Sequence, residues 1–259
     1  MVVVAILLAL VANLLHEDAL PNGKNQGRSS EKTKKIQVVS GGYHEDTYGK
    51  DETIEVAHLL ENQKNPIGLD KVLKINKEER IVIYQTDGTI FSAKAADCQI
   101  NKNGMISMSG KKPFEVVGIM KNPPAKSVMD VANCADEFLS QGQKVMIVYL
   151  DGFGYDTFLE SKAKGLIPFL STFHEEPANT AYPSITPVGF AAMITGQPPK
   201  INGVGDRSNH RLSCPSIFDR ALKENKKNCV IEAAMQILEI NSEVLYNADF
   251  NQDGSTDDE

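Results

Sequence analysis

The sequence predicts an α/β protein, with a parallel sheet covered by helices on both faces and a small β-rich mixed module in front of it. Two observations lead to this class. After residue 127, apolar strand-like runs alternate with helical patterns, which is the order typical of parallel sheets. Before residue 122, short β-like runs follow one another with only brief helical pieces between them.

The chain opens with an apolar run from Val2 to Leu15 that is interrupted only by Asn13. Its length is typical of the central part of a signal peptide and is short for a bilayer span. We therefore expect residues 1–21 to be a signal peptide or membrane anchor, although no Lys or Arg precedes the run, and residues 22–35 to be a polar linker. The protein is then expected to be secreted, periplasmic or anchored outside the cytoplasm. The alternative is a buried helix or strand.

The module that follows spans residues 36–122. Its predicted strands are 36–39, 81–84, 105–108 and 114–120, and its predicted helices lie near 52–63 and 69–75. Asp87-Gly88 is typical of a hairpin turn. A Pro pair, Pro123-Pro124, halts both helix and sheet and predicts a domain boundary.

The predicted α/β domain spans residues 127–259. Ser127 is expected to cap a helix that stops near Gly142, and the apolar run 145–150 is expected to form a buried parallel strand. Further helices are predicted at 157–164, 187–195 and 216–225, and a further strand at 229–233.

Two polar residues are expected at the same edge of this sheet. Asp151 follows the strand 145–150, and ligands of open α/β sheets bind beyond the carboxyl ends of strands. Thr186 is predicted to be the N-cap of a helix that has Pro187 at its first position and ends at Gly196. An anionic group at Thr186 would meet unpaired N–H groups and the positive end of the helix dipole. A divalent metal held by Asp151 would lower the pKa of the Thr186 hydroxyl. The alternative is an ordinary turn and an ordinary helix start.

Residues 144–240 resemble the N-terminal part of the catalytic domain of the alkaline phosphatase superfamily, in particular its nucleotide pyrophosphatase/phosphodiesterase branch. The matching segments are Val148-Tyr149-Leu150-Asp151-Gly152, Pro183-Ser184-Ile185-Thr186-Pro187, Met193-Ile194-Thr195-Gly196 and Gly203-Val204. In that family the aspartate binds one of two metals, usually zinc, and the threonine is the nucleophile and also contacts metal. The resemblance thus implies Thr186 as catalytic residue, Asp151 and Thr186 as metal ligands, and a small phosphorylated substrate.

The chain departs from the family in two places. The branch commonly has an asparagine shortly after the Gly-Val pair, whereas Arg207 lies in that stretch here and is expected either to bind phosphate or to be solvated. The family also draws further metal ligands from beyond the threonine, and no histidine follows His210. The expectation is therefore an incomplete enzyme, such as a gene fragment, with slow or no turnover. The alternative is a non-catalytic protein or an extracellular binding module.

Three further patterns bear on partners. Asp249, Asn251 and Asp253 occupy alternate positions before a glycine, as in the start of a calcium loop, although an acidic solvated loop has the same composition. The net charge of −7 argues against a nucleic-acid-binding surface. The four cysteines lack any C-x-x-C spacing, and we expect unpaired, partly buried thiols. The alternative is a disulfide between Cys214 and Cys229 in an oxidising compartment.

Overall fold

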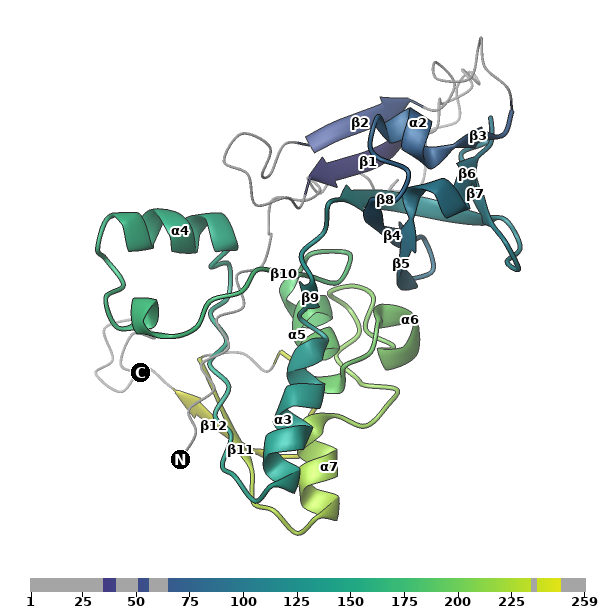
Figure 1. Ribbon diagram of the computed structural model, residues 1–259. Helices are drawn as coiled ribbons and strands as arrows, with labels where there is room; N and C mark the ends of the chain where they lie inside the picture. Colours follow the sequence, from purple (N-terminus) through teal and green to yellow (C-terminus); the bar gives the residue numbers. More distant parts are fainter. Residues whose placement is uncertain (1–34, 41–50, 56–64, 234–236, 248–259) are drawn as a thin grey trace, which may run out of the picture. The chain divides into compact units, whose positions relative to one another are not determined.

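The computed structural model describes residues 35–40, 51–55, 65–233 and 237–247 (Figure 1). The chain divides into two compact units. The described residues up to Ala125 form the first unit, and the described residues from Lys126 onward form the second. The division at Ala125 and Lys126 falls within the stretch around the Pro123-Pro124 pair.

An eight-stranded sheet forms the first unit. Its elements are β1 (Lys35–Ser40), β2 (Asp51–Glu55), β3 (Ile67–Gly68), α2 (Leu69–Leu73), β4 (Arg80–Gln85), β5 (Ile90–Lys94), the 3-10 helix η2 (Ala95–Asp97), β6 (Cys98–Ile100), β7 (Met105–Met108) and β8 (Phe114–Lys121). The strands run in the order β2-β1-β8-β7-β6-β3, and β4 joins β5 to β8. All pairs are antiparallel except β1 with β8.

Strand β8 is the centre of this sheet. Its first residues pair with β7, whereas Gly118 to Lys121 pair with both β1 and β4. Because one strand has two hydrogen-bonding edges, β1 and β4 lie on opposite edges of β8. The β4–β5 hairpin closes at the predicted Asp87-Gly88 turn, where Gly88 has a φ of 80° and its N–H donates to Gln85 O at 3.1 Å.

The predicted helix near residues 52–63 is wrong at its start, because Asp51–Glu55 is strand β2. Residues 56–64 lie outside the described residues. Pairing with β1 in the register Ile36↔Ile54 and Gln37↔Thr53 decides the conformation. Thr and Ile are β-branched, so this stretch suits a strand that has a partner.

The hydrophobic core of the first unit consists of buried apolar residues from the sheet and from α2. Leu69, Ile81, Ile83 and Ile106 are all fully buried. At its margin the Phe91 and Phe114 rings meet edge to face, with centroids 5.3 Å apart. Each such side chain contributes roughly 1.5–3 kcal/mol through burial, so the unit has a hydrophobic core of its own.

The described part of the second unit contains five α-helices and several short strands. Its elements are β9 (Lys126–Ser127), α3 (Asp130–Ser140), α4 (Tyr155–Ala163), the 3-10 helix η3 (Leu170–Thr172), β10 (Ala178–Asn179), α5 (Thr186–Thr195), α6 (Pro199–Asn202), α7 (Ile217–Lys223), β11 (Cys229–Ala233) and β12 (Glu243–Asn247). Strands β9 and β10 form one parallel pair, and β11 and β12 form another.

The predicted fold class is therefore wrong. The main sheet is mostly antiparallel and belongs to the first unit, and the described part of the second unit has only two-stranded parallel pairs rather than a sheet with helices on both faces. The run 145–150 is not a strand, and its Met146 and Val148 side chains are 49% and 37% exposed. A strand forms where a neighbour shares its backbone hydrogen bonds, and the other strand predicted for this domain, Cys229–Ala233, is paired with β12.

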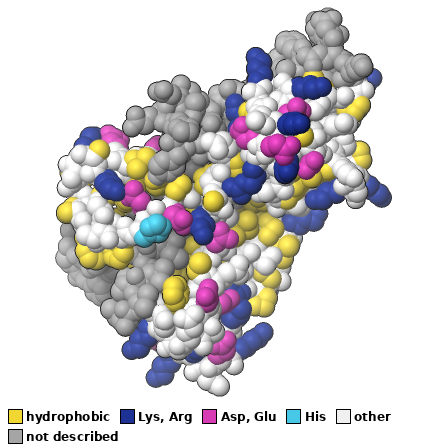
Figure 2. Space-filling model, viewed as in Figure 1, with side chains coloured by type: hydrophobic (Ala, Val, Ile, Leu, Met, Phe, Trp, Pro, Cys, Tyr) yellow, Lys and Arg dark blue, Asp and Glu magenta, His cyan; other side chains and the backbone are white. Residues whose placement is uncertain are grey.

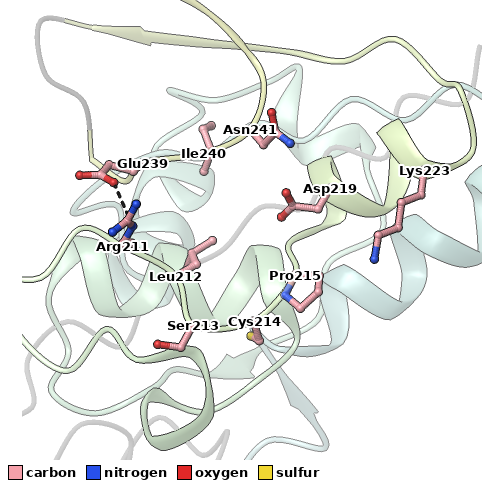
Figure 3. A pocket seen from close by; sticks show the side chains of 10 residues that line it. All are labelled: Arg211, Leu212, Ser213, Cys214, Pro215, Asp219, Lys223, Glu239, Ile240 and Asn241. Carbon is pink, nitrogen blue, oxygen red and sulfur yellow. Dashed lines mark ion pairs between the residues drawn. The ribbon is translucent and has the colours of Figure 1, made fainter.

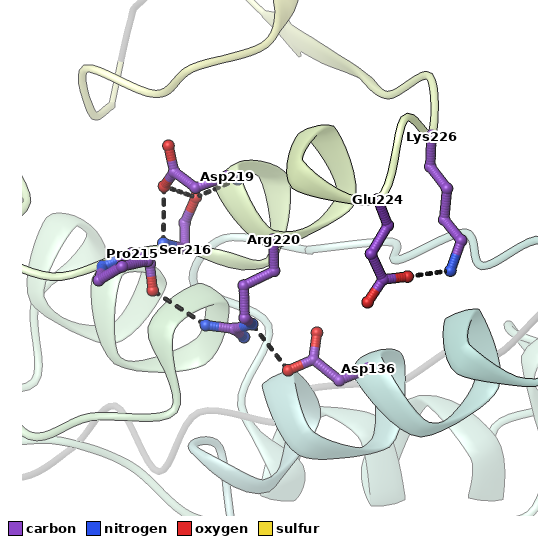
Figure 4. Close-up of polar contacts among 7 residues, drawn as sticks. All are labelled: Asp136, Pro215, Ser216, Asp219, Arg220, Glu224 and Lys226. Carbon is purple, nitrogen blue, oxygen red and sulfur yellow. Dashed lines mark hydrogen bonds and ion pairs between the residues drawn. The ribbon is translucent and has the colours of Figure 1, made fainter.

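Helix α5 is the most buried helix of the second unit, since every residue from Pro187 to Thr195 is buried. A helix that is apolar all round must be surrounded, and both α3 and α7 contact it. The Arg220 guanidinium of α7 links α7 to α3, because its Nε lies 2.7 Å from Asp136 Oδ2 as an ion pair (Figure 4). Its Nη1 donates to Pro215 O at 2.9 Å.

The starts of α7 and α3 agree with the predicted starts to different extents. Helix α7 begins at a full capping box, in which Ser216 Oγ accepts from Asp219 N at 3.3 Å and Asp219 Oδ2 accepts from Ser216 N at 2.7 Å (Figure 4). Helix α3 begins at Asp130, later than predicted, and its N-cap residue is Met129. Ser127 contacts this start by accepting from Met129 N at 3.3 Å.

Charges of both signs share the surface. On the face drawn in Figure 2, Lys and Arg side chains lie beside Asp and Glu side chains. Two of the pairs are Lys94 with Glu78 at 2.8 Å and Lys162 with Glu175 at 2.7 Å. Among the described residues no helix is long and apolar enough to cross a membrane. The predicted signal or anchor, Val2 to Leu15, lies outside the described residues.

Candidate functional site

Asp151 and Thr186 lie side by side, as expected from the sequence. The Thr186 hydroxyl donates to both oxygens of the Asp151 carboxylate, at 3.0 Å to Oδ1 and 3.1 Å to Oδ2. Asp151 is exposed and Thr186 is half-buried, so the pair is open to solvent. The catalytic and metal-binding roles of the two residues remain predictions.

Thr186 does not cap its helix, contrary to the prediction. It is the first residue of α5, and Ile185 is the N-cap residue, with an extended backbone at φ −127° and ψ 154°. The hydroxyl that would turn back to a backbone N–H is used by Asp151 instead. No capping bond comes from the Ile185 side chain, so the N-terminal N–H groups of α5 and its dipole act at the hydroxyl's position.

A second contact holds the Asp151 segment against α5. The Tyr149 ring packs on the Phe190 ring with centroids 5.4 Å apart and planes inclined by 39°. Thr186 and Phe190 are four residues apart in one helix and therefore share a face. The segment from Tyr149 to Asp151 thus lies along that face, and two contacts rather than one set the position of the carboxylate.

The Tyr149 hydroxyl is unusual within this site. Its oxygen is buried and has no hydrogen-bond partner among the described residues. Burial raises the pKa of the Tyr149 phenol, and the nearby Asp151 charge raises it further. The phenol is therefore neutral and remains a donor. Tyr149 forms part of an apolar run, so its sequence position two residues before Asp151 is the only signal that connects it with this site.

The two oxygen donors fit a single hard cation. Two oxygens that bind one Mg²⁺-sized ion at right angles, with bonds of about 2.1 Å, are about 3 Å apart. The observed separations of 3.0 Å and 3.1 Å are close to this spacing, and they are also the lengths of the hydrogen bonds between the two side chains. In the described part of the chain, no group of three or more His, Cys, Asp or Glu side chains is arranged to hold a metal ion. A cation bound by Asp151 and Thr186 alone would keep several water ligands.

Within the described residues, no hydrogen bond or ion pair joins Arg207 to Asp151 or Thr186. It is exposed, in a bend that Asp206 organises by accepting from Ser208 N at 2.8 Å and Asn209 N at 3.2 Å. The Asn209 amide in turn donates to Gly203 O at 2.5 Å. Side chains of the bend therefore bond to the bend's own backbone. The predicted calcium ligands Asp249, Asn251 and Asp253 lie outside the described residues.

A shallow, open pocket of about 540 Å³ lies elsewhere in the second unit (Figure 3). Polar and apolar residues from two separate stretches line it: Arg211, Leu212, Ser213, Cys214, Pro215, Asp219, Lys223, Glu239, Ile240 and Asn241. Arg211 Nε and Glu239 Oε2 are 3.6 Å apart across its rim, and both side chains are largely exposed. No sequence pattern joins these stretches, so the pocket was not predicted.

Comparison with protein-family models, with curated proteins and with solved structures found no match to this chain. The likeness to the alkaline phosphatase superfamily therefore rests on the residues that carry it and stays a prediction.

Proposed function

We propose that the site of Asp151 and Thr186 binds phosphate esters and hydrolyses them with Thr186 as the nucleophile. The substrate class is a phosphodiester, a nucleotide pyrophosphate or a phosphomonoester. The observation that carries the proposal is the hydrogen bond from the Thr186 hydroxyl to both oxygens of Asp151 at the start of α5. A hydroxyl beside a carboxylate at a helix N-terminus has an acceptor for its proton and donors for a phosphate.

The proposed chemistry has two steps. The Thr186 oxygen attacks phosphorus, its proton passes to the Asp151 carboxylate, and the ester bond to the leaving oxygen breaks. The leaving oxygen then takes up a proton, and the product is a phospho-threonine. In the second step, water attacks the same phosphorus and the Thr186 oxygen leaves, which releases phosphate or a phosphomonoester and restores the hydroxyl.

The negative charge that develops on the phosphoryl oxygens needs stabilisation. The N-terminal N–H groups of α5 and its dipole supply part of it. A divalent cation bound by Asp151 and Thr186 would supply more, and would lower the pKa of the hydroxyl. The resemblance to the alkaline phosphatase superfamily favours zinc as the cation. Two oxygen donors without nitrogen or sulfur equally suit magnesium or manganese. A single cation cannot stabilise both the attacking and leaving oxygens, so we expect slow turnover.

The experiment compares the full chain with Thr186→Ala and with the control Thr157→Ala, an exposed threonine of α4. The substrates are bis(p-nitrophenyl) phosphate and p-nitrophenyl phosphate, with Zn²⁺, Mg²⁺ or Mn²⁺ added. Slow, cation-dependent release of nitrophenol by the wild type and the control, and none by Thr186→Ala, is expected. A phosphorylated Thr186 peptide in quenched reactions identifies the nucleophile.

Two other outcomes are informative. Turnover that Thr186→Ala does not reduce contradicts the proposal. Binding of inorganic phosphate that requires Thr186, without any turnover, favours the alternative of a non-catalytic binding protein. In that case the hydroxyl and the helix start recognise the anion, but no bond to phosphorus is formed.

A further inference from the structure

Asn103 and Gly104 form the tip of the β6–β7 hairpin in the first unit. The Asn103 side chain is exposed, and among the described residues the one hydrogen bond of Asn103 is that of its backbone N–H, which donates to Asn101 Oδ1 at 2.9 Å. Gly104 has a φ of 70°. Because glycine has no Cβ, no side chain shields its backbone nitrogen. The Asn103 carboxamide can therefore rotate toward the nitrogen of the adjoining peptide.

We propose that Asn103 is a site of spontaneous deamidation through a cyclic imide. The Gly104 nitrogen attacks Asn103 Cγ and gives up its proton, the bond from Cγ to Nδ2 breaks, and ammonia leaves with that proton. Water then adds to one of the two imide carbonyl carbons and breaks the bond of that carbon to the Gly104 nitrogen, which regains a proton. The residue at position 103 becomes aspartate or isoaspartate. Water is consumed and ammonia is released, with no oxidation or reduction.

A second Asn-Gly pair provides a comparison within the same chain. Asn202 lies at the end of α6 and is fully buried. Its Nδ2 donates to Gln197 O and its Oδ1 accepts from Val204 N, both at 2.8 Å. The carboxamide must break both hydrogen bonds before it can turn toward the Gly203 nitrogen, which is unfavourable because its partners are then left unpaired.

The glycine nitrogens themselves do not distinguish the two pairs. The Gly104 N–H donates to Asn101 O, and the Gly203 N–H donates to Pro199 O, each at 2.9 Å. Each nitrogen must therefore leave one hydrogen bond before it attacks. Since this requirement is shared, the side chains decide the difference, and the barrier is lower at Asn103.

Deamidation changes the hairpin in two ways. It adds a negative charge beside Lys102, and isoaspartate adds a carbon to the backbone of the turn. Isoaspartate also carries an exposed α-carboxylate, so the altered hairpin suits a carboxyl methyltransferase that is specific for this group. Asn103 belongs to the first unit, so this chemistry is independent of the site of Asp151 and Thr186 in the second.

The test uses the full chain and the variant Asn103→Gln, in which the attack would have to close a larger ring. Both are incubated in mildly alkaline buffer, with and without urea, and sampled over time. Peptide mass spectrometry measures the deamidated fraction at positions 103 and 202 separately. Transfer of a labelled methyl group by an isoaspartate methyltransferase identifies the isoaspartate peptides. The peptides also separate a third pair, Asn22-Gly23, which lies outside the described residues.

In the native chain we expect Asn103 to deamidate at least about tenfold faster than Asn202, a ratio that corresponds to one hydrogen bond that must break first. In urea the two rates should approach each other, because neither side chain is then held by the fold. The hairpin peptide of Asn103→Gln should accept no methyl groups.

Equal native rates at the two positions, or a faster rate at Asn202, would overturn the inference. An Asn103 that stays intact in the native chain but deamidates in urea would also overturn it, because the folded turn would then protect this residue.

Discussion

The Thr186 hydroxyl forms a hydrogen bond shared between both carboxylate oxygens of Asp151, at 3.0 Å and 3.1 Å, although the two residues are 35 positions apart in the chain. This contact is exposed, and exposed polar contacts add little to stability. The hydrogen bond is therefore expected to contribute little to the free energy of unfolding.

The first prediction concerns the charge at this position. Asp151→Asn keeps an oxygen acceptor for Thr186 but removes the negative charge that attracts a cation. We expect the free energy of unfolding to change by less than about 0.5 kcal/mol, as for other exposed substitutions. Binding of Mn²⁺, measured by titration calorimetry, should be lost. Asp156→Asn, an exposed residue at the start of α4, is the control, and equal Mn²⁺ affinity in both variants would speak against a cation at Asp151.

The second prediction concerns the end of α5. Gly196 has a φ of 71°, and a Cβ there would lie 3.2 Å from Ala132 Cβ and 3.3 Å from Met129 O at the start of α3. Gly142 has a φ of 76° with nothing within 4 Å. Gly142→Ala should cost about 1–2 kcal/mol through left-handed strain alone. Gly196→Ala should cost about 1–3 kcal/mol more, because the added methyl group is overpacked against α3.

Urea unfolding of the two variants measures this difference. Equal losses of stability would mean that α3 moves away without cost, and that the close approach of α3 to Gly196 contributes little to the fold.

The third prediction concerns acid stability. Burial raises the pKa of Asp219, but the hydrogen bonds from Ser216 and Asn241 outweigh it and leave this pKa below its ordinary value. A carboxylate with a lowered pKa stabilises the folded state above the ordinary aspartate pKa of about 3.9, and this stabilisation is lost as the pH falls through the folded-state value. Asp219→Asn should therefore be less stable than the wild type at pH 7, and the difference should narrow below about pH 4.

Thermal unfolding at a series of pH values provides the measurement. Ser140→Ala, an exposed position at the end of α3, serves as the control and should show no such convergence with the wild type. A constant difference between Asp219→Asn and the wild type at all pH values would show that charge has no part in the capping of α7.

The fourth prediction concerns thiol reactivity. All four cysteines are free, and Cys98 is buried whereas Cys134 and Cys229 are exposed. Burial, with the Asp97 charge, raises the pKa of Cys98 to about 11. Since the thiolate is the reactive form, iodoacetamide at pH 8 should modify Cys134 and Cys229 and leave Cys98 intact. Peptide mass spectrometry reports the sites, and urea should expose Cys98. Rapid labelling of Cys98 in the native protein would contradict its place in the core.

Local features were predictable from the sequence where a few neighbouring residues determine them. Gly88 in the β4–β5 turn, Ser216 at the start of α7 and Gly196 at the end of α5 have the predicted positions, because turn and cap chemistry acts over two to four residues. The adjacency of Asp151 and Thr186 was also expected, although the reason given for it, a shared sheet edge, was wrong.

The errors arose where distant residues decide the outcome. An apolar run such as 145–150 predicts burial in a strand, yet strand formation depends on a partner elsewhere in the chain. Ile54 lies in a strand because of Ile36 in β1, not because of its neighbours. Threonine is a common N-cap residue, but the Thr186 hydroxyl donates to Asp151, which lies in another segment of the chain. The Tyr149–Phe190 contact could not be inferred before these segments were placed together.

The parallel pairing of β1 with β8 has a consequence for how the chain folds during synthesis. Gln37 is paired with Gly118, so roughly 80 residues must leave the ribosome between the two strands before they can meet. Strand β1 is therefore expected to join the sheet late, after the β4–β5 hairpin has formed from neighbouring residues. Until then its apolar Ile36 and Val38 have no core to enter, and the nascent chain is most open to aggregation and chaperone binding in that interval.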